Sequence, residues 1–130
     1  MNTNIFLRFG LIIIFIMHSV TGMLDGGIND FGNNYLNEVG FAPLGLPLAW
    51  MIKLSHLAAV FSLVLNKGIK VMGAISILIL VIGIIMIHGK EGWFVVGGGR
   101  NGMEFNFLLI LVWLQVMFPR FELSIPLPGK

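Results

Sequence analysis

The sequence contains no cysteine among its 130 residues. Disulfides, thiol redox chemistry, thiolate metal sites and iron–sulfur clusters ligated by this chain are therefore excluded. Charged side chains are also scarce, at 11% of the residues against about 25% in an average soluble domain. The eight Lys and Arg residues are scattered and form no basic stripe, so the charge pattern does not indicate a nucleic-acid partner.

Apolar residues are abundant instead, at 57% of the chain, and they gather in four long runs. A helix of about 20 residues covers the roughly 30 Å of a bilayer's hydrocarbon core. Backbone groups in lipid must bond within their own segment, and these runs do not alternate as barrel strands would. The sequence therefore predicts one domain, residues 1–130, folded as an all-α four-transmembrane-helix bundle. The expected spans are 4–24, 44–65, 69–88 and 103–118.

The first run has an alternative interpretation as a secretory signal peptide with Arg8 in its charged region. Ser19-Val20-Thr21 is a poor cleavage site, however, and the apolar residues continue to Leu24. We therefore expect this run to be a membrane span.

Basic residues indicate the orientation of the spans, because cytoplasmic loops are rich in Lys and Arg. The two ends of the chain and the turn at residues 66–70 contain Arg8, Lys67, Lys70, Arg120 and Lys130. The other two loops contain only Lys90 and Arg100. Both termini are therefore expected in the cytoplasm.

Between the first two spans, apolar side chains recur at helical spacing from Phe31 to Val39. Asp30 before them suits an N-cap, and Gly40 after them suits a helix terminator. We expect a short amphipathic helix that lies at the membrane interface.

Titratable side chains inside the spans are the main functional signal, because a charge in hydrocarbon is costly. Lys53 and His56 stand three residues apart near the middle of the second span, and therefore on one helix face. They should face the bundle interior or a partner subunit. A neutral imidazole there can accept a proton from a quinol hydroxyl or ligate a metal. The structural alternative is a polar pair that fixes the register of the helices.

Three more titratable residues are expected at the outer end of the bundle. His18 lies late in the first span, His88 ends the third, and Glu104 opens the fourth. Together they would suit a quinone headgroup, a proton relay or a transition metal, although no metal site is predicted from their spacing. Glu104 also fits a capping box with Asn101 as the N-cap. Arg8 is expected to snorkel to the cytoplasmic headgroups, with a buried acceptor as the alternative.

Several short motifs follow one another along nearly the whole chain. They are Leu7-Arg8-Phe9-Gly10-Leu11, His18 with Gly22, Phe31-Gly32-Asn33-Asn34-Tyr35-Leu36, Val39-Gly40-Phe41, Gly68-Ile69-Lys70, Ile87-His88-Gly89, Gly97-Gly98-Gly99 and Glu104. In this pattern the chain resembles the DoxX-like family of small four-helix membrane proteins. It departs from the family at His56, where members often carry a carboxylate, and at residues 119–126, where members tend to have a Gly-rich end.

The resemblance implies a bacterial inner-membrane location and a loose association with quinone-linked oxidoreductases. The chain would bind a quinone or a similar lipid-soluble ligand beside a catalytic partner, with no cofactor of its own, and would be at most a subunit of such an enzyme. His18, His56, His88 and Glu104 would supply proton-accepting contacts, and Lys53 would tune them. The alternative is a non-enzymatic accessory subunit of a larger membrane complex or a homo-oligomer, in which Lys53 pairs with an acid on a neighbouring chain.

Overall fold

The computed structural model describes residues 4–120, and that part of the chain contains helices and no strand. Three long helices match the first three predicted spans: α1 (Ile5–Leu24), α3 (Gly45–Leu65) and α4 (Ile69–Met86). Each is long and apolar enough to cross a membrane, which indicates a membrane protein. The predicted cytoplasmic Lys130 and most of the divergent segment 119–126 lie outside the described residues.

The fourth apolar helix is short. α5 (Glu104–Met117) has 14 residues, and its length is therefore about 21 Å, less than the roughly 30 Å of a hydrocarbon core. Pro119 limits its end, because proline has no N–H and disfavours helical geometry at the residue before it. The prediction of an all-helical membrane protein is thus confirmed with three candidate spans, and α5 as a fourth span stays a proposal.

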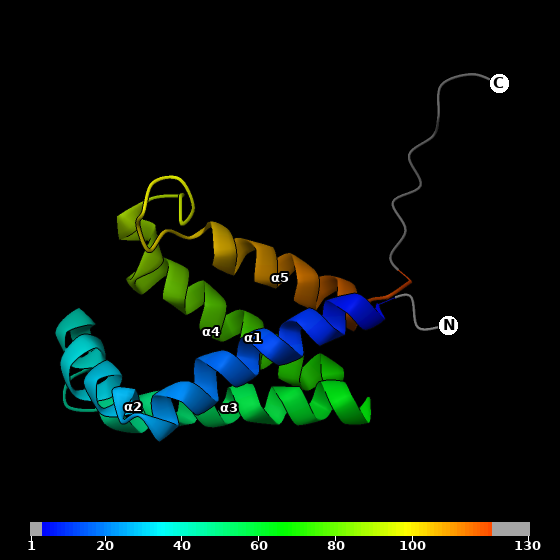
Figure 1. Cartoon of the computed structure of the whole chain (residues 1–130), viewed down its shortest axis with the longest axis horizontal. Coiled ribbons are helices and arrows are strands. Elements are labelled where there is room, and N and C mark those ends of the chain that lie inside the picture. The colour runs from blue at the N-terminus through cyan, green and yellow to red at the C-terminus, as the bar shows by residue number, and fades with distance from the viewer. Residues whose placement is uncertain (1–3, 121–130) are drawn as a thin grey trace, which may run out of the picture.

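The four apolar helices pack in sequence, and α5 returns to contact α1. In Figure 1, α1 and α3 lie along each other, and α4 and α5 diverge from them toward the end that carries α2. We call that end, formed by residues 24–45 and 87–103, the open end, and the end where α1 begins and α5 finishes the closed end. The main core lies between two helix pairs, α1 with α3 and α4 with α5. Its largest fully buried side chains are Leu11, Phe15 and Trp113.

The helix predicted between the first two spans is present, but it begins earlier than expected, and its place at the membrane interface stays a prediction. α2 (Gly27–Asn29) runs directly into the π-helical segment η1 (Asp30–Phe41). The Asp25 carboxylate accepts a 2.8 Å hydrogen bond from the Gly27 N–H, so the helical segment starts there and Asp30 lies within it. The prediction of Asp30 as N-cap was therefore wrong. Gly40, at φ 113°, interrupts the helix as predicted.

η1 crosses the start of α3 at very close range. A Cβ placed on Gly32 would stand 2.5 Å from the Cα of Leu46. Nearby, the Oδ1 of Asn37 accepts a 2.9 Å hydrogen bond from the Gly45 N–H. A second small cluster is buried between these elements, and its members are Ile28, Leu36 and Ala49. η1 is thus held against α3 by apolar packing and by the Asn37–Gly45 hydrogen bond, in addition to its covalent connections.

Candidate functional site

Lys53 lies in the first half of α3 and points toward α1. Its Nζ donates a hydrogen bond to the backbone carbonyl of His18 and stands 5.1 Å from the centroid of the Phe31 ring. The Lys53 Cε lies against α1 at Gly22, where a Cβ would make an ordinary van der Waals contact at 3.9 Å. Among residues 4–120, no carboxylate comes within 4.0 Å of the ammonium.

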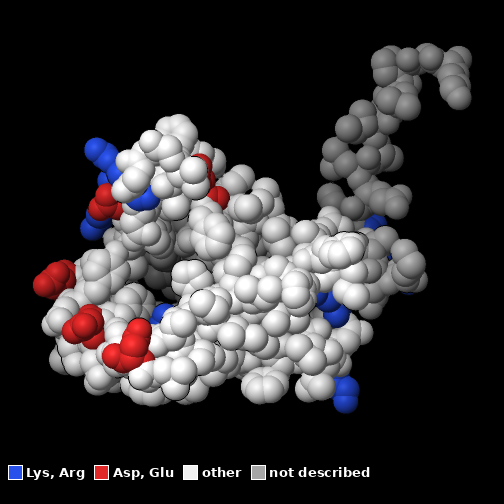
Figure 2. Space-filling view, viewed as in Figure 1, with Lys and Arg blue, Asp and Glu red and all other residues white. Residues whose placement is uncertain are grey.

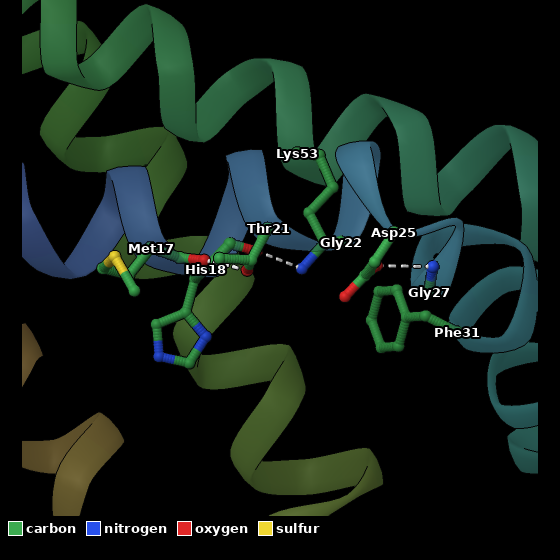
Figure 3. Close-up of a pocket in the computed structure, with 8 residues that line it drawn as sticks. All are labelled: Met17, His18, Thr21, Gly22, Asp25, Gly27, Phe31 and Lys53. Carbon is green, nitrogen blue, oxygen red and sulfur yellow. Dashed lines mark hydrogen bonds between the residues drawn. The ribbon is translucent and has the colours of Figure 1, made fainter.

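The surroundings of Lys53 form an open hollow of about 380 Å³. Its lining includes Met17, His18, Thr21, Asp25, Phe31 and Lys53. Figure 3 shows the ammonium reaching across α1, with His18 on one side and with Asp25 and Phe31 on the other. Figure 2 shows a depression between the two diverging helix pairs, with a basic group beside it. The hollow therefore combines the Lys53 ammonium, the His18 imidazole and the Asp25 carboxylate with the apolar side chains of Met17 and Phe31.

His56 lies one helical turn further into the bundle than Lys53. Its ring stacks on Phe15, with the centroids 4.5 Å apart and the planes at 30°. Both of its ring nitrogens are buried and bond to no group in the described part of the chain, and the same holds for Ser19 Oγ and Trp113 Nε1. Buried polar atoms nearly always have a partner in folded proteins. These four atoms belong to α1, α3 and α5 and place polar groups in the interior of the bundle.

The structure turns Lys53 and His56 inward, as predicted from the cost of exposing them to lipid. It gives them different surroundings, however. Lys53 reaches an open hollow, whereas His56 stacks on the Phe15 ring and has both ring nitrogens buried.

His18, His88 and Glu104, which were predicted to converge at the outer end of the bundle, each contact different residues. His18 is exposed in the hollow, with its ring centroid 6.3 Å from that of Phe105. His88 belongs to η2 (His88–Glu91), and its Nδ1 lies 2.8 Å from the carbonyl oxygen of Asn101. In residues 4–120, no three His, Cys, Asp or Glu side chains are grouped so that they could hold a metal ion.

Glu104 bonds to the preceding loop. Its Oε1 accepts hydrogen bonds from the N–H groups of Val95 at 2.6 Å and Val96 at 2.9 Å. The capping box was therefore a wrong prediction: Met103 is the N-cap, and no side chain caps the helix. The loop carbonyls of Gly92 and Trp93 accept from the N–H groups of Met103 and Glu104, which satisfies two of the free donors at this helix start.

Arg8 reaches across to the end of α3. Its Nη1 donates to the Leu63 carbonyl at 3.4 Å, where the helix carries partial negative charge. The structure thus supports the alternative of a protein acceptor over snorkelling for this side chain.

The sequence analysis missed Asp25 and Phe31 as part of the hollow. They join it because the turn at Gly26, with φ 80°, folds η1 back toward the end of α1. The only sequence signal for this turn is the pair Gly26-Gly27. Ser19 and Trp113 were not predicted as buried polar groups either, because the sequence alone does not show which polar side chains on an apolar helix are buried.

Outside the membrane-spanning helices, Tyr35 stacks on Phe31 with the ring centroids 6.0 Å apart. Burial, and after it the negative charge of Glu91, raise the pKa of Tyr35 above its ordinary value.

No protein-family model matches this chain, and searches of curated proteins and of solved structures also give no match. The resemblance to the DoxX-like family stays a prediction from short motifs. The function has to be inferred from the chemistry of the site itself.

Proposed function

We propose that this chain is a DoxX-like inner-membrane protein that binds a quinone, or a similar lipid-soluble carbonyl compound, in the hollow at Lys53. The observation that carries the proposal is an ammonium group on an apolar, membrane-length helix, set in an open hollow with no carboxylate in residues 4–120 within 4.0 Å. A cation at such a position is costly and is usually kept for function. A carbonyl oxygen can accept a hydrogen bond from it without bringing a second charge into the membrane.

Lys53 has donors left for such a ligand. An ammonium carries three N–H groups, and in the described part of the chain only the bond to the His18 carbonyl is formed. The His18 imidazole stands in the same hollow and can donate to, or accept a proton from, an oxygen of the ligand. Met17 and Phe31 provide apolar contacts for a ring. These residues fit a flat, polar-edged headgroup.

His56 would serve as a second proton acceptor behind the hollow. Its unpaired nitrogens lie one turn deeper than Lys53, and a bridging water would connect them to the ligand. A bound quinone would supply two-electron redox chemistry. This chain would orient it and hold the proton, and a partner protein would exchange the electrons.

Titration of the detergent-purified chain with decylubiquinone tests this proposal. Lys53→Met should weaken binding by about tenfold or more, because it removes a hydrogen bond from a charged donor. Lys90→Met is the matched control: Lys90 is exposed in η2 at the same end and should be neutral. Equal binding by wild type and Lys53→Met would overturn the proposal.

A non-enzymatic accessory subunit is the second candidate, favoured by the same ammonium, since a carboxylate on a neighbouring chain would also fit it. Extraction in mild detergent distinguishes the two roles. A stable larger complex that Lys53→Met disrupts, with no quinone bound, supports the accessory role. A lone chain that retains quinone supports the first proposal.

A further inference from the structure

A second groove, of about 400 Å³, lies at the closed end of the bundle, away from the Lys53 hollow. It is formed by the start of α1, the turn between α3 and α4, and the end of α5. The lining residues that matter here are Arg8, Lys70, Val71, Val116 and Met117. The groove thus combines two cations with an apolar wall at the level where the helices end.

The charge at this end has a single sign within residues 4–120. Its members are Arg8, Lys67, Lys70 and Arg120. The acidic residues of the described range belong to the other end, and they are Asp25, Asp30, Glu38, Glu91 and Glu104. In Figure 2 the visible acidic groups accordingly lie away from the N-terminal end of the molecule. The groove therefore attracts anions and has no described acid to neutralise its cations.

The two cations keep free hydrogen-bonding capacity. Arg8 makes one 3.4 Å bond through Nη1, while its Nε is buried and bonds to no group in the described chain. The Nζ of Lys70 lies 5.5 Å from the centroid of the Phe118 ring, and among residues 4–120 it has no carboxylate within 4.0 Å. Both can therefore donate to an anionic oxygen.

The start of α4 adds to this positive potential. Gly68 precedes the helix, no side chain caps it, and its first turn contains no acid. The free N–H groups of a helix N-terminus favour phosphate oxygens. Ile69, Lys70 and Val71, which belong to that first turn, line the groove.

We propose that this groove binds the phosphodiester headgroup of an anionic phospholipid. Arg8 and Lys70 hold the phosphate, and the acyl chains follow the exposed apolar face of α4 that begins at Val71 and continues at Ile75 and Leu78. The apolar wall selects a lipid over a free phosphate, because it continues onto helix faces of membrane-spanning composition. This site is independent of the quinone proposal, since none of its lining residues belongs to the Lys53 hollow.

Native mass spectrometry of the detergent-purified full chain tests the site. We expect dioleoyl-phosphatidylglycerol to be retained in preference to dioleoyl-phosphatidylcholine. Lys70→Gln should lower the affinity for phosphatidylglycerol at least about fivefold, and Lys70→Arg should preserve it. Arg8→Gln should act in the same direction as Lys70→Gln.

Lys67→Gln is the matched control, because Lys67 is an exposed cation at the same end that does not line the groove. It should leave the phosphatidylglycerol affinity nearly unchanged. Three results would overturn the proposal: equal losses in Lys67→Gln and Lys70→Gln, equal retention of the two lipids, or displacement of the lipid by sodium phosphate at millimolar concentration. The last result would indicate a site for free anions.

Discussion

Lys53 and His56 share one helix face, yet the structure gives them different chemistry. Lys53 ends beside a backbone carbonyl and an aromatic face, both of which stabilise a cation. His56 has an aromatic ring against it and no bonded partner in residues 4–120. Residue spacing predicts the shared face, but it does not predict the contacts of the two side chains, because α1 and η1 supply them.

Glu104 is a second residue whose side chain bonds to backbone groups several residues away in the chain. We expect Glu104→Ala to loosen residues 92–103, because the Val95 and Val96 N–H groups lose their acceptor. Arg100 lies in this loop, so trypsin cleavage there should become severalfold faster in detergent solution. The cleavage rate is measured by mass spectrometry of the fragments.

Glu91→Ala is the control for this experiment. Glu91 is an exposed acid in η2, next to the same loop, and it should leave cleavage at Arg100 unchanged. If Glu91→Ala accelerates cleavage as much as Glu104→Ala, the effect is one of net charge, and the proposed role of the Glu104 carboxylate fails.

At the scale of elements, η1 is defined by its contact with α3 as much as by its own sequence. Its apolar spacing predicts a helix, and that helix is present. Its wider π-helical form, and the extension of the helical segment back to Gly27 through α2, were not predicted. They accompany the close crossing at Gly32 and Gly45, where two backbones approach without intervening side chains.

We expect Gly32→Ala to destabilise the protein by about 1–3 kcal/mol, because the added Cβ collides with the Leu46 backbone. Gly10→Ala is the matched control in α1, since a Cβ at Gly10 meets nothing within 4 Å. It should be neutral or should stabilise by up to about 1 kcal/mol through helix propensity. Thermal unfolding of both variants in one detergent measures the difference. A Gly32→Ala protein as stable as wild type would show that η1 is not packed as described.

At the scale of the whole molecule, the helix pairs meet at the closed end and diverge at the open end. The Lys53 hollow lies at the open end and is lined by residues of α1, η1, α3 and the turn between α1 and α2. Charge is distributed along the same axis, with basic residues alone at the closed end of the described chain. The distribution favours a cytoplasmic closed end.

Labelling of single cysteines tests this orientation, because the chain has no cysteine of its own. Lys67→Cys and Lys90→Cys place one thiol at each end of α4. In intact cells, a membrane-impermeant maleimide should label Lys90→Cys at once and Lys67→Cys only after permeabilisation. Labelling of both variants in intact cells would place the two ends of α4 on the same side, and the membrane-spanning arrangement would be wrong.

The sequence by itself determined the membrane class and the helix positions, because apolar runs, scarce charge and proline or glycine boundaries are local properties. It also identified Lys53 and His56, since a charged or polar side chain on an apolar helix stands out without any structure. Only the tertiary structure decided that Lys53 meets the His18 carbonyl and Phe31, that His88 and Glu104 bond elsewhere, and that Arg8 and Lys70 share a groove. These outcomes depend on how helices distant in the chain cross and diverge, and no local pattern specifies those angles.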